Sequence, residues 1–194
     1  MSVINSDSVR AGASGAVTAA YTIEQSCRFN DDDSAFLSRT PGVTGNQRTW
    51  TFSAWVKRGN LGTSSALFSA GATGDSDTNH FNVYFNSDTI WITSGATNFL
   101  KTTQVFRDPS AWFHVVVAVD TTSATADNRI RLYINGTEVT VFSARSNPAQ
   151  NLATVVNLAG EVHVIGKNAS ASLYLDTDLA DVHFIDGQQL AATS

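Results

Sequence analysis

The sequence predicts an all-β fold of two packed antiparallel sheets, and three observations support this prediction. The segment 113–119 is apolar at every position except His114, so both faces of this strand should be covered by other parts of the chain. Asn135-Gly136 separates two strand-like runs and favours a hairpin, because a type I′ turn needs positive φ at both central residues. Turn-forming residues recur about every ten positions, which is typical of a sandwich or barrel.

The individual strands are indicated by alternation of apolar and polar residues. Apolar side chains alternate from Trp50 to Val56 and from Phe81 to Phe85, as expected for strands with one face on a core. Trp50 and Trp112 both fall on apolar faces, and we expect both to be largely buried. No segment has a convincing helical period. The expected strands are 21–29, 35–39, 48–58, 65–71, 79–86, 89–94, 98–105, 111–120, 129–135, 138–143, 160–166, 171–176 and 179–186.

Composition limits the classes of partner. The chain has 194 residues, enough for one domain with a large core. The net charge is −5 and no basic run occurs, which argues against nucleic-acid binding because phosphate backbones require clustered cations. No apolar run approaches the roughly 20 residues that a membrane span needs, so no membrane partner is expected. Cys27 is the single cysteine; it cannot form an internal disulfide, and we expect it to be a buried small hydrophobic residue.

The chain divides into three parts. Residues 1–20 form an extended arm rich in Ala, Gly, Ser and Val, which can bury too little surface to order itself. Residues 21–190 contain the predicted strands and form the domain. Residues 191–194 are a short tail.

Four sequence blocks resemble the concanavalin A-like, laminin-G-like jelly roll, in matching order and spacing. This resemblance covers about residues 21–190 and implies a jelly-roll sandwich of two curved antiparallel sheets with one concave face. The blocks are TWTFSAWVKRG (49–59), AWFHVVVAVD (111–120), NRIRLYINGTEV (128–139), and VIG (164–166) followed by LADVHFIDGQQL (179–190).

The front of the chain resembles proteins of marine tailed bacteriophages in INSDSVRAGASGA, QSCRFNDDDSAFLSRTPG and TWTFSAWVKRGNLG. The resemblance implies a non-enzymatic structural protein on the virion surface, most simply a capsid decoration protein that binds the major capsid protein or other virion proteins as a homo-oligomer. The arm would be its anchor. The alternative is a carbohydrate-binding adhesin that recognises host surface glycans. The candidate anchor residues are Val3, Ile4, Val9 and Arg10.

No catalytic residue is predicted. Glucanases of this fold carry a Glu-x-Asp-x-Glu strand, and retaining hydrolysis needs two carboxyl groups about 5 Å apart. None of the three glutamates (Glu24, Glu138 and Glu161) has a second carboxylate two or four residues away. The nearest substitute is Asp176-x-Asp178, which is better explained as a solvated turn or a charge-protected strand edge.

Two aspartate clusters leave calcium open as a structural ion. Carboxylate oxygens are the ligands that calcium prefers, but Asp and Ser also favour turns through local side-chain hydrogen bonds, and the turn interpretation is preferred. The histidines have no metal-ligand spacing, and no other cofactor is expected. The candidate calcium ligands are Asp31, Asp32, Asp33, Asp75 and Asp77.

A candidate glycan site follows from the phase of two strands. If Phe81, Phe85 and their alternating neighbours fill the core, Tyr84 and Trp91 lie on the opposite face of the sheet, with His80 and Asn82 beside Tyr84. Aromatic rings with neighbouring amides suit sugars, whose CH faces stack while their hydroxyls pair with polar groups. Packing against a loop or a partner would produce the same pattern.

Overall fold

The computed structural model describes residues 22–71, 79–169 and 173–192. The strands in this part of the chain agree with the predicted ones to within a few residues at most positions. They are β1 (Cys27–Phe29), β2 (Leu37–Arg39), β3 (Thr49–Arg58), β4 (Ser65–Gly71), β5 (His80–Asn86), β6 (Thr89–Ser94), β7 (Thr97–Thr102), β8 (Phe113–Asp120), β9 (Ile130–Ile134), β10 (Thr137–Glu138), β11 (Phe142–Arg145), β12 (His163–Ile165) and β13 (Thr177–Asp186), with a 3-10 turn η2 (Ala126–Asn128).

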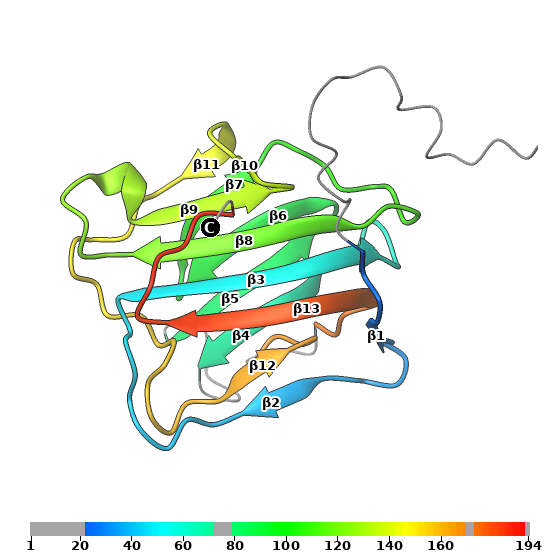
Figure 1. Cartoon of the computed structure of the whole chain (residues 1–194), viewed down its shortest axis with the longest axis horizontal. Helices are drawn as coiled ribbons and strands as arrows, with labels where there is room; N and C mark the ends of the chain where they lie inside the picture. The colour runs from blue at the N-terminus through cyan, green and yellow to red at the C-terminus, as the bar shows by residue number, and fades with distance from the viewer. Residues whose placement is uncertain (1–21, 72–78, 170–172, 193–194) are drawn as a thin grey trace, which may run out of the picture.

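The strands form two antiparallel sheets that lie one behind the other (Figure 1). The six-stranded sheet has the order β1-β13-β3-β8-β9-β10, and the seven-stranded sheet has the order β11-β7-β6-β5-β4-β12-β2. This arrangement confirms the predicted all-β jelly-roll sandwich. Three expected strands differ: 21–29 is reduced to β1, 138–143 is split into β10 and β11, and of 171–176 only Tyr174 forms an isolated bridge, with Lys167.

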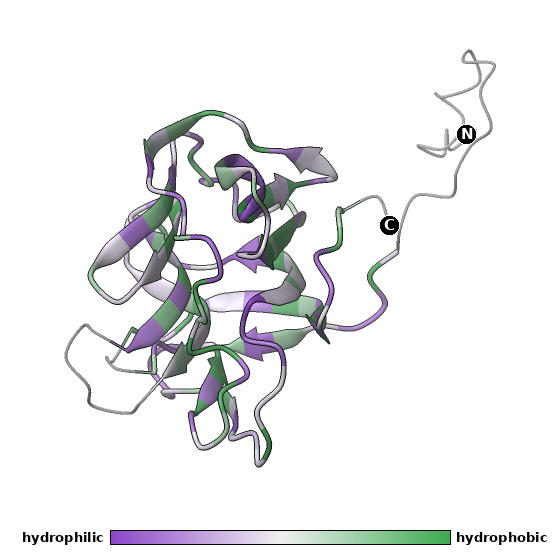
Figure 2. Ribbon diagram, turned by 90° about the vertical axis from the view of Figure 1, so that its left-hand side faces the viewer, coloured by the Kyte–Doolittle hydropathy of each residue, from purple (hydrophilic) through white to green (hydrophobic). Residues whose placement is uncertain are grey.

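The core lies between the sheets and is rich in aromatic side chains. Trp50 and Phe52 of the six-stranded sheet, and Phe81 and Phe85 of the seven-stranded sheet, are fully buried. The Trp50 ring meets Phe81 edge-on, with the ring centroids 5.0 Å apart. In Figure 2 apolar and polar residues alternate along the strands, which is how each sheet keeps one face for the core. The predicted burial of Trp50 is confirmed.

Strand β8 is covered on both faces, as its sequence predicts. Val115 and Val117 enter the core, while Val116 and Ala118 lie on the outer face and are also buried. The segment after β13 runs across this outer face (Figure 1), where Leu190 N donates to Thr51 Oγ1 at 2.9 Å. Ala192 of the tail packs against Val116 and Ala118 on this face. The tail therefore contributes to the fold.

The hairpin prediction is confirmed, and two burial predictions are wrong. Asn135 and Gly136 have φ of 50° and 80° between β9 and β10, as a type I′ turn requires. Trp112 precedes β8 and is only partly buried; by alternation it falls on the outer face with Val116 and Ala118, not on the core face. Cys27 is exposed, because β1 is the outermost strand of its sheet and only its last residue, Phe29, reaches the core.

In the described part of the chain no helix is long and apolar enough to cross a bilayer. The candidate anchor residues Val3, Ile4, Val9 and Arg10 lie outside the described residues, as do Asp75 and Asp77.

Candidate functional site

An open groove of about 530 Å³ lies on the outer face of the seven-stranded sheet. Strand β5 forms its floor, because Phe81, Val83 and Phe85 point into the core and the intervening residues must point outward. The groove is rich in amide side chains. The described residues that line it are Ser64, His80, Asn82, Tyr84, Asn86, Thr93, Gly95, Ala96, Asn98, Asn168 and Leu173.

One wall of the groove, formed by Asn168 and its neighbours in the segment 167–169, is hydrogen-bonded to β4. Ala169 N donates to Ser69 Oγ at 2.6 Å, and Ser69 Oγ donates to Lys167 O at 3.2 Å. Asn168 N donates to Leu173 O at 3.3 Å, and both residues line the groove. On the other side the turn between β6 and β7 contributes lining residues. The Ser69 hydroxyl therefore ties the backbone of residues 167 and 169 to β4 beside the groove.

The floor contains two buried polar atoms that lack a partner in the described structure. Asn82 is 2% exposed and its Oδ1 accepts no hydrogen bond, and His80 is 7% exposed and its Nδ1 makes none. Asn82 Nδ2 makes one long contact, 3.5 Å, to Thr93 Oγ1. A buried polar atom without a partner costs free energy, and a molecule bound in the groove could supply the missing hydrogen bonds if the two side chains turned toward it.

Tyr84 and Trp91 are cross-strand neighbours on the outer face, as predicted. Their rings meet edge to face with centroids 5.9 Å apart. Lys101 Nζ lies 3.6 Å from the centroid of the Trp91 ring, and Trp91 Nε1 donates to Thr89 Oγ1 at 2.9 Å. Trp91 therefore packs against the Tyr84 ring and is not among the residues that line the groove. Burial raises the pKa of Tyr84, partly offset by a hydrogen bond with Asn86, so the phenol stays neutral near pH 7.

The structure thus brings three of the four predicted glycan-site residues together. His80, Asn82 and Tyr84 line one groove, and Trp91 lies beside it. Thr93 and Asn98 were missed, although the pairing of β6 with β7 places them opposite each other. The alternation that selected Asn82 and Tyr84 also selects Asn86. Nothing in the local sequence signals Asn168, which reaches the groove from a distant segment.

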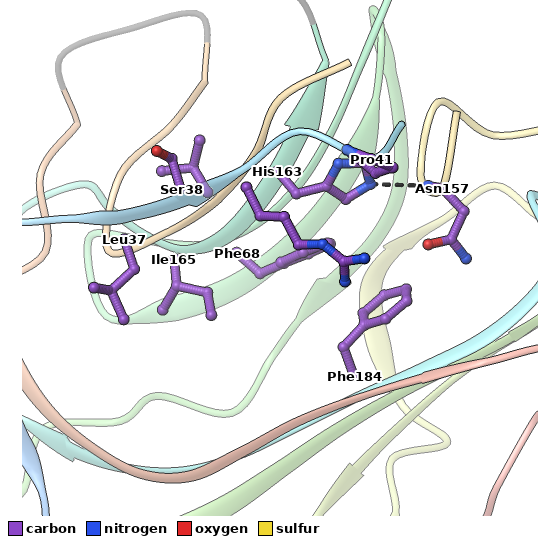
Figure 3. A pocket seen from close by; sticks show the side chains of 10 residues that line it. Leu37, Ser38, Pro41, Phe68, Asn157, His163, Ile165 and Phe184 are labelled. Atoms are coloured by element: carbon purple, nitrogen blue, oxygen red, sulfur yellow. Dashed lines mark hydrogen bonds between the residues drawn. The ribbon is translucent and has the colours of Figure 1, made fainter. Parts of the chain in front are cut away.

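A second cavity, of about 190 Å³, opens between the sheets at the β2 edge. Figure 3 shows Phe68 of β4 and Phe184 of β13 facing this opening, with Leu37 and Ile165 beside them. The cleft is mostly apolar, and Leu37 and Phe184 are 56% and 38% exposed. At its rim Asn157 N donates to His163 Nε2 at 2.8 Å.

A third cavity, on the outer face of the six-stranded sheet, contains two histidines. His114 Nε2 lies 2.7 Å from Ser53 Oγ, and the His114 ring stacks on Trp55 with centroids 5.0 Å apart. Burial lowers the pKa of His114, and the neighbouring His183 lowers it further. These contacts give His114 a structural role on this face of the sheet.

This lowered pKa predicts that stability decreases in acid. The unfolded chain binds a proton at His114 near the ordinary pKa of about 6.5, more readily than the folded chain does. The contribution of His114 should be fully present above about pH 6.5 and be lost progressively below it. Urea unfolding of the native protein and of His114→Gln at pH 7.5 and 5.5 measures it, and the variant should lose less stability on acidification. An identical loss in both proteins would contradict this assignment.

The aspartate cluster at residues 31–33 forms a turn in the structure. Ser34 N donates to Asp31 O at 3.0 Å, and Asn30 Nδ2 donates to Asp33 Oδ2 at 2.8 Å. Asn60 Nδ2 reaches Asp31 Oδ2 at 3.4 Å. Among the described residues no group of three or more His, Cys, Asp or Glu side chains is arranged to hold a metal ion. These hydrogen bonds support the turn interpretation, and calcium binding stays a prediction.

Thermal melting in calcium chloride and in EDTA tests the calcium alternative. A turn that is held by its own hydrogen bonds predicts the same Tm in both solutions, because nothing binds selectively to the folded state. A calcium-dependent rise in Tm that is lost in Asp31→Asn would instead establish an ion at this turn.

The carboxylate pair Asp176 and Asp178 lies away from the groove. Asp176 forms an ion pair with Arg28 and accepts a hydrogen bond from Asn60 N at 3.1 Å. Asp178 lies in β13, opposite Lys57 of β3. These contacts support the structural interpretation of the pair, which joins strand ends of the six-stranded sheet.

Comparison with solved structures identifies several similar folds. Domain 4 of AbnA, an extracellular arabinanase from Geobacillus stearothermophilus solved with arabinotriose, is 19% identical with a TM-score of 0.58, covering 85% of this chain and 72% of that one. The NanB sialidase of Streptococcus pneumoniae is 13% identical with a TM-score of 0.61, covering 87% and 26%. The CBM40 of the Ruminococcus gnavus IT-sialidase is 13% identical with a TM-score of 0.53, covering 82% and 95%. The chain thus spans about a quarter of the NanB chain.

None of the curated proteins compared with this chain matches it significantly. The family model described as the concanavalin A-like lectin/glucanases superfamily matches residues 29–192, which include every strand from β2 to β13. The match covers most of the chain and agrees with the two-sheet sandwich. The chain therefore belongs to the concanavalin A-like lectin/glucanase superfamily.

Proposed function

We propose that this protein is a non-enzymatic carbohydrate-binding domain that holds a glycan in the groove on the outer face of its seven-stranded sheet. The observation that carries the proposal is the pair of unpartnered polar atoms, Asn82 Oδ1 and His80 Nδ1, in the floor of an amide-rich groove. A sugar hydroxyl is both a donor and an acceptor, and an asparagine amide offers two donors and an acceptor.

The composition of the groove supports binding and not hydrolysis. Its described lining residues supply amides, hydroxyls, an imidazole and the Tyr84 ring, and they include no carboxylate. Glycoside hydrolysis generally uses two carboxyl groups that flank the scissile bond. Saccharide binding within this superfamily fold is illustrated by the AbnA domain solved with arabinotriose, which supports the proposal by fold alone.

Direct binding of the protein to a glycan array tests this function. The native protein should bind a subset of glycans weakly, so the array should be probed with a multivalent form. Asn82→Leu should abolish the signal, because it removes the amide at nearly constant side-chain volume. Gln150→Ala removes an exposed amide outside the groove and should leave the signal unchanged. Retention of binding by Asn82→Leu would exclude the groove as the site.

A second function, attachment to a virion, is favoured by the bacteriophage resemblance at the front of the chain and by the exposed apolar cleft at the β2 edge. Exposed apolar surface of this kind marks protein contacts. In this proposal a homo-oligomer on the virion surface binds the major capsid protein through the arm. A protein lacking residues 1–20 should fold but fail to bind empty capsids. Full binding by the truncated protein would contradict the anchoring role.

A further inference from the structure

The charge of the groove restricts the glycans that it can hold. None of its described lining residues is an aspartate, glutamate, lysine or arginine. The lining residues that the structure describes therefore offer hydrogen bonds without a counter-ion. The burial that keeps the Tyr84 phenol protonated also keeps a negative charge from developing on that side chain.

The two lysines nearest the walls of the groove are already engaged with aromatic rings. Lys101, on β7, has its ammonium 3.6 Å from the centroid of the Trp91 ring. Lys167, on the segment that carries the Asn168 wall, has its ammonium 5.1 Å and 5.2 Å from the centroids of Phe36 and Tyr174. Moving either ammonium into the groove would break a cation–π contact. Neither lysine lines the groove.

An anionic sugar would therefore enter a partly desolvated groove without a positive partner. A carboxylate or sulfate that loses water must be paired to avoid a large free-energy cost. The protein's net charge of −5 adds a weak long-range repulsion. Neutral sugar hydroxyls meet no such cost, because amides satisfy their donors and acceptors together.

We propose that the groove selects uncharged glycans and excludes glycans that carry a carboxylate or sulfate at the bound residue. The selected sugar would place a hydroxyl over Asn82 and His80, whose side chains would turn to present Oδ1 and Nδ1 to it. Asn82 Oδ1 would then accept the hydroxyl proton, and the hydroxyl oxygen would accept from the imidazole in the tautomer that is protonated at Nδ1. Stacking of an apolar sugar face on Tyr84 would complete the contact. This inference rests on the proposed carbohydrate-binding function and adds the chemical class of the ligand.

Matched pairs of oligosaccharides test the inference. Each neutral oligosaccharide on an array is compared with the same oligosaccharide bearing a terminal sialic acid or sulfate. The native protein should bind the acidic member at least about tenfold more weakly wherever the acidic group occupies the bound residue, because that group lacks a counter-ion. Binding of the neutral member should be nearly constant between about 50 and about 500 mM NaCl, since no ion pair is formed.

A charge-introducing variant provides the matched control. Asn98 is partly exposed at the side of the groove, so Asn98→Lys adds a cation without burying it. This variant should gain binding to the acidic members, and Asn98→Gln, which adds length without charge, should not.

The outcomes separate the selection of neutral glycans from glycan binding by the groove itself. Stronger binding of acidic members by the native protein, weakened by salt and abolished by Asn82→Leu, would overturn the selection of neutral glycans and leave the groove as a glycan site. Binding that is unaffected by Asn82→Leu, or no binding to any glycan, would overturn the inference together with the proposed function.

Discussion

Trp50→Ala should lower the free energy of unfolding by about 3–5 kcal/mol, the range found when large aromatic side chains are removed from a core. Trp50 is fully buried and stands at the centre of an aromatic cluster, with ring centroids 5.0 Å from Phe81, 5.9 Å from Phe184 and 6.3 Å from Phe68. Because these rings come from both sheets, the cavity left by the indole would weaken the contact between the sheets. Chemical denaturation followed by far-UV circular dichroism measures the loss.

Trp50→Phe separates the packing of the ring from its hydrogen bond. Trp50 Nε1 donates to Thr154 Oγ1 at 3.3 Å, a long contact of about 1 kcal/mol at most. Trp50→Phe should therefore be more stable than Trp50→Ala, because the phenyl ring fills part of the cavity. It should remain less stable than the native protein, because a smaller cavity is left. If Trp50→Ala unfolded at the same denaturant concentration as the native protein, the proposed core would be wrong.

Asp88→Ala should cost about 3–5 kcal/mol, because it leaves a buried guanidinium without its counter-ion. Arg58 has a fully buried side chain, and its NH2 lies 3.6 Å from Asp88 Oδ1. Asp88 also accepts hydrogen bonds from Gly62 N at 2.8 Å and from Arg107 Nε at 2.7 Å. The aspartate thus connects three segments at one end of the sandwich. Urea unfolding measures the expected loss.

Arg107→Ala is the matched control for this ion pair. Its side chain is 66% exposed, and an exposed partner of a salt bridge contributes about 0–1 kcal/mol. A loss as large as that of Asp88→Ala would show that the buried Arg58 is not the reason for the effect. The hydrogen bonds from Arg107 and Gly62 hold the pKa of Asp88 below its ordinary value. Its contribution should therefore be complete above about pH 4 and be lost as pH falls further.

The sequence predicted the faces of the strands well, because side-chain direction in a strand has a period of two. Asn82 and Tyr84 could be placed opposite Phe81 and Phe85 from alternation alone. The same rule anticipated that β8 would be covered on both sides. What covers its outer face could not be inferred, because the segment 188–192 reaches it only after the chain has left β13.

Strand ends and contacts between distant segments were not predictable in the same way. Trp112 and Cys27 alternate correctly with buried neighbours, but Trp112 lies before the first residue of β8 and Cys27 lies on the outermost strand of its sheet, so Trp112 is only partly buried and Cys27 is exposed. The role of Trp91 depends on Lys101, whose position opposite it follows from a register shift between Ile92 and Thr93. Such a shift leaves no local sequence signal, so the contact of Trp91 with Lys101 could not be predicted, and sugar stacking on Trp91 stays a prediction.

Asn82→Leu should not lower the free energy of unfolding. Asn82 Oδ1 is buried without a partner in the described structure, so replacing the amide by an apolar group of similar size should leave the free energy of unfolding unchanged or increase it. A residue kept for structural reasons would show the opposite result. Gain or retention of stability with loss of glycan binding is the pattern that a functional residue produces.

The central claim, that the groove on β5 holds a glycan, is tested most directly by nuclear magnetic resonance. The side-chain amide signals of Asn82, Asn86 and Asn98 should shift progressively when a neutral oligosaccharide selected on the array is titrated into the labelled protein. Signals from the cleft at Leu37 and Phe184 should stay in place. Shifts confined to that cleft, or no shift of the three asparagine amides at saturating sugar, would contradict the account.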